Sequence, residues 1–203
     1  MTTKTTTTKV EKPISLKIYK TDPRNELPKF ATEQSACFDL AAQFYGKDNY
    51  QGYNANNVLF DRKFVNNQVK LMPGDRMIVP TGLIFDIPEG YSLRIHARSG
   101  LSLKQGIVLV NAEAVIDSDF VHETSVLLVN TSNNPITVKH GDRIAQAELV
   151  PVLSYDFTET KKAPRDKTSR KGGLGSTGIE TKEEPESTNK VEEPKNEEKV
   201  GAV

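Results

Sequence analysis

Two aspartates and an aromatic residue in the segment NAEAVIDSDF, which starts at Asn111, are the most informative candidates for chemistry in this 203-residue sequence. Asp117 and Asp119 stand two positions apart, so on a β-strand they point to the same face and their charges interact. One carboxylate of such a pair can act as a general base that activates water, while the ring of Phe120 packs on a sugar. The same pattern also fits the solvated end of a strand.

A second segment, ARSGLSLKQG, combines groups that bind phosphate. It supplies Arg98, Ser99 and the backbone N–H groups around Gly100. The guanidinium is a planar fork of donors, serine adds a small hydroxyl, and glycine leaves room for phosphate oxygens. An ordinary surface turn has a similar composition.

Three further polar segments carry weaker signals. In ATEQSACFDLAA, Asp39 follows small residues and either caps a turn or serves a site. In HGDRIAQAELVPV, Gln146 follows a Gly-Asp turn and faces either solvent or a ligand. In SRKGGLGSTG, Arg170 precedes glycines that allow backbone N–H groups to approach an anion closely, although a flexible linker looks the same.

Short β-strands are the elements that must position these groups. From about Ile14 to Val152 apolar and polar residues alternate with period two, as in ISLKIYK, and turn signals such as Pro-Thr-Gly and Asn-Asn-Pro separate the runs. The pattern predicts an all-β sandwich or barrel rather than a parallel sheet with crossover helices. One short helix is expected near SLKQG. We expect a single folded domain over residues 14–155.

The remaining segments differ in composition from this domain. Residues 44–67 are rich in Asn, Tyr, Gly and Gln, and we expect a long hairpin or another ordered excursion there because Tyr45, Tyr50, Tyr53, Phe60 and Phe64 are available for burial. We expect residues 1–13 to be a disordered N-terminal segment, 156–178 to be a mobile arm with the glycine-rich motif, and 179–203 to be a disordered charged tail.

Composition excludes several classes of protein. Lys and Arg number 27, as do Asp and Glu, so net charge gives no reason to expect nonspecific nucleic-acid or membrane binding. A single cysteine, Cys37, excludes an internal disulfide, offers too few thiols for a cysteine-based zinc site and favours a reducing compartment. The start has no apolar export signal, and no apolar run reaches 18 residues. We expect a soluble cytoplasmic protein with no stable nucleic-acid partner.

Five segments occur in an order that resembles the motifs of the trimeric dUTPase family: ACFDLAA, ARSGLSLK, NAEAVIDSDF, GDRIAQAELVPV and RKGGLGSTG. These enzymes hydrolyse dUTP to dUMP and pyrophosphate, which keeps uracil out of DNA and supplies dUMP for thymidylate synthesis. The resemblance covers residues 14–178. It implies a jelly-roll-like β subunit, a homotrimer with three active sites at subunit interfaces, a Mg²⁺ cofactor, and a C-terminal arm that closes each site.

The resemblance also implies a role for each matching residue. Asp117 corresponds to the carboxylate that orients and deprotonates the attacking water, and Asp39 to one that holds Mg²⁺ through coordinated water. Asn111 corresponds to the floor of the base pocket, and Phe120 stands where a family tyrosine packs under the deoxyribose and excludes a 2′-hydroxyl. The residues implied in holding the phosphate chain are Arg98, Ser99, Gly100 and Gln146, joined from the arm by Arg170, Gly172, Gly173, Leu174, Gly175, Ser176 and Thr177.

The sequence departs from the family pattern at several positions. Leu174 replaces the phenylalanine whose ring stacks on uracil, which bears on base selectivity. Cys37 and Ala114 replace usual glycines, Ala97 replaces a usual proline, and the 44–67 segment is longer than usual.

Three alternatives accompany the dUTPase hypothesis. The first is a related enzyme activity, either that of the dCTP deaminase branch or that of a broadened pyrimidine deoxynucleotide hydrolase. The second is a non-catalytic trimeric protein of the same fold that binds a regulatory partner through residues 44–67. The third is a structural β-sandwich.

Overall fold

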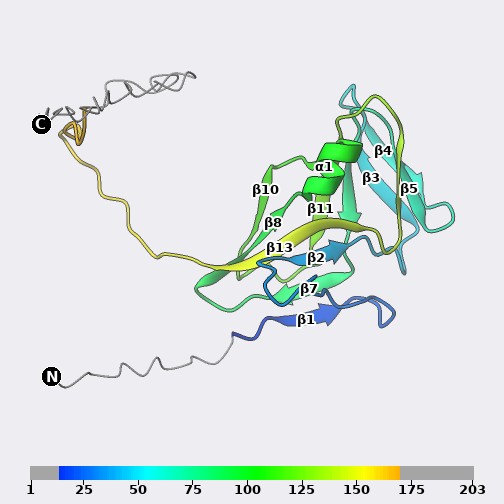
Figure 1. Ribbon diagram of the computed structural model, residues 1–203, viewed down its shortest axis with the longest axis horizontal. Coiled ribbons are helices and arrows are strands. Elements are labelled where there is room, and N and C mark those ends of the chain that lie inside the picture. The colour runs from blue at the N-terminus through cyan, green and yellow to red at the C-terminus, as the bar shows by residue number, and fades with distance from the viewer. Residues whose placement is uncertain (1–13, 170–203) are drawn as a thin grey trace, which may run out of the picture. The chain divides into compact units, whose positions relative to one another are not determined.

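Antiparallel strands make up almost all of the regular structure in the computed structural model, which describes residues 14–169 (Figure 1). Within this range a single helix, α1 (Ser99–Gln105), falls where SLKQG predicts one. The all-β expectation is therefore confirmed. The strands are β1 (Lys17–Lys20), β2 (Phe38–Ala41), β3 (Asn49–Tyr53), β4 (Leu59–Lys63), β5 (Gln68–Leu71), β6 (Arg76–Pro80), β7 (Leu83–Asp86), β8 (Tyr91–His96), β9 (Ile107–Leu109), β10 (Glu113–Ile116), β11 (Ser125–Asn130), β12 (Ile136–Lys139) and β13 (Arg143–Pro151).

Two larger sheets enclose the hydrophobic core in a jelly-roll-like sandwich. One has the strand order β10-β8-β13-β2, the other β4-β3-β6-β11-β9, and the pairs β1-β7 and β12-β5 complete the structure. Alternate residues of each large sheet point inward, so Leu93 and Ile95 of β8 belong to the same buried cluster as Val126 and Leu128 of β11. Burial of each such side chain contributes about 1.5–3 kcal/mol.

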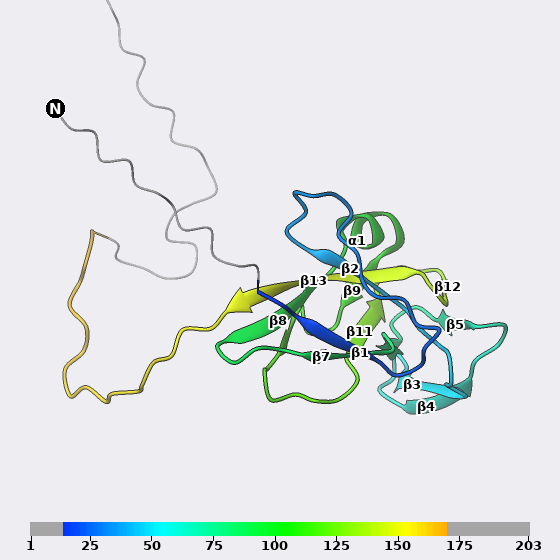
Figure 2. The same cartoon turned by 90° about the horizontal axis from the view of Figure 1, so that it is seen from below.

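The 44–67 segment contains a β-hairpin, formed by β3 and β4, that extends the five-stranded sheet through the pairing of β3 with β6. Aromatic packing explains why it is ordered: the ring of Phe64 lies 4.6 Å from that of Phe44 and 5.4 Å from that of Tyr50. Tyr53, by contrast, is 45% exposed. Figures 1 and 2 both place this hairpin beside β5 at one end of the sandwich.

The chain divides into two compact units, the first ending at Tyr155 and the second beginning at Asp156. In the second unit, residues 156–169 are described and contain neither helix nor strand.

No helix within residues 14–169 is long and apolar enough to cross a membrane.

Candidate active site

Three of the predicted site residues meet at one end of the four-stranded sheet, on its outward face. Phe38 and Leu40 of β2 point into the core, so Asp39 between them points outward. Asp39 lies opposite Gln146 of β13, and Gln146 lies opposite His96, the last residue of β8. Arg98 follows two residues later. The sheet register thus brings together Asp39, Gln146 and Arg98, which are far apart in the sequence.

Two guanidinium groups hold the Asp39 carboxylate from both sides. Arg98 Nε lies 3.0 Å from Asp39 Oδ1, and Arg143 Nη1 donates a hydrogen bond of 2.9 Å to Asp39 Oδ2. Arg98 Nη1 also donates to the backbone carbonyl of Arg143 at 2.8 Å. We call Asp39, Arg98 and Arg143 the arginine cluster. Its two positive charges exceed its one negative charge, so it carries a net attraction for a polyanion.

A tight turn places Arg143 in this cluster. Gly141 has a φ of 84°, a conformation that favours glycine, and its N–H donates to the carbonyl of Ala42 at 2.7 Å. Ala42 N–H in turn donates to the carbonyl of Asp142 at 2.8 Å. The turn is therefore bonded directly to the end of β2. A β-bulge between Arg143 and Ala145 follows at the start of β13, and such bulges re-aim the side chains beside them.

The other expected phosphate ligands surround Arg98. Gln146 Nε2 donates to the carbonyl of Ala97 at 3.1 Å, which fixes the backbone immediately before Arg98. Arg98 itself is the extended N-cap residue of α1, and its carbonyl accepts the first helical hydrogen bond, from Ser102 N at 3.0 Å. Ser99 and Gly100 begin α1 and are exposed. The structure thus brings all four predicted phosphate ligands of the described region close together.

Clefts open on both sides of the arginine cluster. One of about 390 Å³ is lined by Asp39 and Arg143 together with the segment that contains Lys29. The other, of about 370 Å³, lies between α1 and the turn before β13, and is lined by both Arg98 and Arg143. Arg143 therefore lines both clefts, whereas Arg98 lines only the second.

The residues predicted to act as base and sugar platform lie elsewhere. Strand β10 ends at Ile116, and Asp117 begins a turn in which Phe120 N–H donates to the Asp117 carbonyl at 3.1 Å. The expectation that Asp117 and Asp119 share one face of a strand is therefore wrong, because the strand stops before either residue. Asp117 is exposed, as is Asn111 in the turn between β9 and β10. Phe120 is 37% exposed, and its ring meets that of His122 edge-on.

The sheet register separates Asp117 from the arginine cluster within one chain. Ile116 pairs with Leu93, so Asp117 lies level with Ser92, six residues before Arg98 along the β8 segment. Extended chain rises about 3.3 Å per residue, which puts the two positions about 20 Å apart. A single chain therefore does not join the expected base to the expected phosphate ligands.

The expected arm residues, Arg170, Gly172, Gly173, Leu174, Gly175, Ser176 and Thr177, lie outside the described residues. Sequence reasoning missed Arg143 as a site residue. A signal was available, because this arginine directly follows the Gly-Asp turn in the segment that was singled out for Gln146.

Comparison with known proteins identifies the family. A family model described as dUTPase matches residues 59–178. Proteins named deoxyuridine 5'-triphosphate nucleotidohydrolase are 40% identical over 154 residues in Brucella melitensis and 37% identical over 153 residues in Wolbachia; each alignment covers 75% of this chain and 85% of the relative.

Solved structures share the fold. A dUTPase of Staphylococcus bacteriophage 80alpha, in complex with dUpNHpp, superposes with a TM-score of 0.63 at 18% identity, covering 81% of this chain and 99% of that one. A dUTPase from phage phi11 of S. aureus, described with a structural Mg(II) ion, gives a TM-score of 0.57 at 16% identity, covering 73% and 98%.

Proposed function

The chain belongs to the dUTPase family, and on that premise we propose how its residues share the work of cleaving dUTP. The protein is a dUTP diphosphatase: it hydrolyses dUTP to dUMP and pyrophosphate. The removal of dUTP keeps uracil out of DNA, and the product supplies thymidylate synthesis. The single thiol and the nucleotide substrate favour the cytoplasm as the site of action. The comparisons do not favour the deaminase or the non-catalytic alternative, because the matched relatives are named as dUTP hydrolases.

The arginine cluster binds the triphosphate. Phosphoanhydride hydrolysis depends mainly on positioning and on stabilisation of charge at the phosphoryl oxygens. Arg98 and Arg143 each retain donors beyond those that hold Asp39, since a guanidinium has five N–H groups. Asp39 keeps both forks in place before substrate arrives. Ser99, Gly100 and Gln146 complete this half of the site from α1 and β13.

A neighbouring subunit supplies the base. The observation that carries this proposal is the separation of about 20 Å between Asp117 and Arg98 within one chain, estimated from the strand register. A base must lie within hydrogen-bond reach of the water that it activates, directly or through one water. A cyclic homotrimer, in which each contact joins two different surfaces, can place Asp117 of one copy against the arginine cluster of the next.

The donor set near the cluster fits a divalent cation that is held indirectly. Both oxygens of Asp39 are already engaged by guanidinium groups, and its side chain is only 18% exposed. Mg²⁺ retains several water ligands and binds chiefly to substrate phosphates with one or two carboxylates, so Asp39 would hold it through water. When bound, the cation supplies neutralisation of charge on the triphosphate oxygens.

The remaining groups select and enclose the substrate. Exposed Asn111 lies at the floor of the uracil pocket, and the half-exposed ring of Phe120 packs against the deoxyribose. Arg170 and the glycine-rich segment that includes Leu174 close over the triphosphate, because glycines let backbone N–H groups reach phosphate oxygens. The regulatory partner expected at residues 44–67 has no support in the contacts of the hairpin and is not proposed.

Subunit complementation tests the shared site. Arg98→Ala and Asp117→Asn each remove one half of the site, so each homotrimer should be inactive. Random assembly of the two variants at equal amounts should restore about one quarter of the sites, because each site draws its halves from two chains. Pyrophosphate release from dUTP, measured before and after the variants are unfolded and refolded together, reports the result. A mixture that stays inactive, although wild-type protein recovers in parallel, would contradict the shared site.

A further inference from the structure

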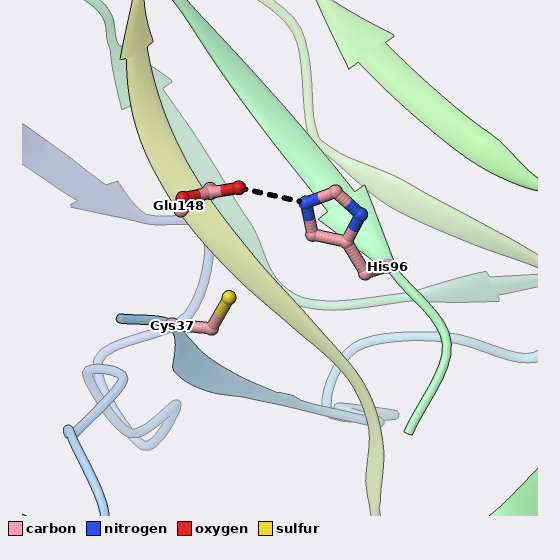
Figure 3. A group of neighbouring side chains, drawn as sticks. All are labelled: Cys37, His96 and Glu148. Carbon is pink, nitrogen blue, oxygen red and sulfur yellow. Dashed lines mark hydrogen bonds and ion pairs between the residues drawn. The ribbon is translucent and has the colours of Figure 1, made fainter. Parts of the chain in front are cut away.

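Three potential metal ligands meet beside the arginine cluster, on the same outward face of the four-stranded sheet. They are Cys37, immediately before β2, His96 at the end of β8, and Glu148 in β13 (Figure 3). One ligand atom from each lies within 4.8 Å of the other two, and His96 Nε2 is 3.2 Å from Glu148 Oε1. All three residues are half-buried, so an ion from solvent can reach them.

Strand register explains why these side chains converge. Ala147 pairs with Phe38, which brings its neighbour Glu148 level with Cys37, and Gln146 pairs with His96. The alternating inward residues are buried, so the three ligands project outward together. Each ligand is two positions along the chain from a residue of the proposed phosphate-binding half of the site. Cys37 precedes Asp39, His96 precedes Arg98, and Glu148 follows Gln146.

We propose that Cys37 Sγ, His96 Nε2 and a carboxylate oxygen of Glu148 bind one zinc ion. Zinc bonds are about 2.3 Å to sulfur and about 2.0–2.2 Å to nitrogen and oxygen, so neighbouring ligand atoms of a tetrahedral site lie about 3.3–3.7 Å apart. His96 Nε2 and Glu148 Oε1, at 3.2 Å, are close to this spacing, and Cys37 Sγ lies within 4.8 Å of both, so binding requires only a small inward shift of the thiol. Three protein ligands leave the fourth position to water.

The surroundings of His96 support a ligand role. Its other ring nitrogen, Nδ1, lies 3.7 Å from Glu113 Oε1, and Arg94 Nη1 donates to the second oxygen of Glu113 at 3.2 Å. Zinc-binding histidines almost always direct their second ring N–H to a carboxylate, a carbonyl or a water, which fixes the tautomer and the ring orientation. At 3.7 Å, Glu113 lies just beyond hydrogen-bond distance of Nδ1, so a small shift of its side chain would make this contact while Nε2 faces Glu148.

The ligand set favours zinc over magnesium. Mg²⁺ prefers oxygen ligands in octahedral geometry, whereas a thiolate, an imidazole and one carboxylate suit Zn²⁺. Burial, and then the charge of Glu148, raise the pKa of the Cys37 thiol, and a bound dication opposes both effects. A mixed site of this kind needs only one thiol, so the single cysteine of this chain is sufficient for it.

Such a site would hold three strands together. The ion would bridge β8, β13 and the start of β2 directly beside the residues that position Asp39, Arg98 and Gln146. The existence of this site does not depend on the assignment of Asp117 or on the shared active site.

Cobalt(II) titration of the reduced, untagged, chelator-treated full-length protein tests the proposal. We expect saturation at one ion per chain, a thiolate-to-cobalt charge-transfer band and tetrahedral d–d bands, all abolished by zinc but unaffected by excess Mg²⁺. Cys37→Ser, close in size, should lose the charge-transfer band, and His96→Ala should lose saturable binding. Glu113→Gln should weaken binding about 10- to 100-fold. His122→Ala, which removes an exposed histidine elsewhere, should bind as wild type does.

Thermal unfolding provides a second readout. Zinc should raise the melting temperature of the wild-type protein but not of Cys37→Ser, provided that far-ultraviolet circular dichroism shows both to be folded. Absence of a charge-transfer band in the wild-type protein, a Cys37→Ser variant that retains it, or displacement of cobalt by Mg²⁺ would overturn the proposal. None of these outcomes bears on dUTP turnover, which is measured separately with Mg²⁺.

Discussion

Arg143 Nη1 lies 2.9 Å from Asp39 Oδ2 and so joins the start of β13 to the middle of β2. Arg98 reaches the other oxygen of the same carboxylate, at 3.0 Å from Nε. In the absence of substrate this carboxylate therefore acts as a positioning group for two guanidiniums. The arrangement keeps positive charge concentrated where we propose that the triphosphate binds, at little conformational cost when the substrate arrives.

Removal of Arg143 should affect activity more than stability. Its side chain is 57% exposed, so Arg143→Ala should lower the free energy of unfolding by less than about 1 kcal/mol in urea denaturation. A hydrogen bond to a charged group contributes about 1.5–3 kcal/mol, so kcat/KM for dUTP should fall about 10- to 100-fold.

Lys17→Ala is the matched control, because it removes an exposed ion pair with Asp86 that joins β1 to β7 and includes no residue of the arginine cluster. This variant should change neither the free energy of unfolding nor kcat/KM for dUTP appreciably. Full activity of Arg143→Ala would limit Arg143 to a structural role.

Asp117→Asn should abolish turnover while nucleotide binding persists. A positioned general base contributes about 10²- to 10⁴-fold, and asparagine cannot accept the proton. Asp119→Asn is the control, because it makes the same change in the same exposed turn. Single-turnover pyrophosphate release and isothermal titration with a non-hydrolysable dUTP analogue separate the two effects. A large loss in Asp119→Asn alone would reassign the base.

Phe120→Ala should reduce discrimination against a ribose sugar. We propose that the ring of Phe120 occupies space that a 2′-hydroxyl would need, so its removal should lower the ratio of kcat/KM for dUTP to that for UTP by about tenfold or more. Phe120→Tyr keeps the ring and should preserve the ratio. An unchanged ratio in the alanine variant would place the sugar elsewhere.

Truncation should separate catalysis from folding. The first compact unit ends at Tyr155, so a chain that ends at Thr168 should retain the melting temperature of the full-length protein. The loss of Arg170 and the glycines should nevertheless cut turnover strongly, because these groups are proposed to cover the triphosphate. A chain that ends at Ile179 keeps them and should remain active. Full activity after truncation at Thr168 would refute the arm's role.

The same substitution at two glycines should have opposite effects on stability. Gly141 has a positive φ, so Gly141→Ala should cost about 1–2 kcal/mol, although open space surrounds the added methyl group. Gly100 lies in α1 with ordinary φ and equally open space, so Gly100→Ala should stabilise by up to about 1 kcal/mol. Urea denaturation measures both. Equal effects would show that the turn tolerates a side chain without strain.

Local patterns in the sequence were sufficient to predict the fold class and to identify most of the candidate site residues. Period-two alternation predicted an all-β chain because the preference for a strand depends on a residue and its near neighbours in the sequence. The helix near SLKQG was predicted for the same reason. Ordered motifs identified Asp39, Arg98, Gln146 and the dUTPase family. The strand assumed for Asp117 and Asp119 was wrong, since the position at which a strand ends depends on its partners.

Only the tertiary structure decided which groups meet. Asp39 and Arg143 are 104 positions apart in the chain, and His96 and Glu148 are 52 apart, so no local periodicity encodes either contact. Both follow from the register of neighbouring strands, which the burial of alternate side chains fixes, because a slip of one residue would expose the core face. The same register moves Asp117 away from Arg98 and gathers Cys37, His96 and Glu148 on one face.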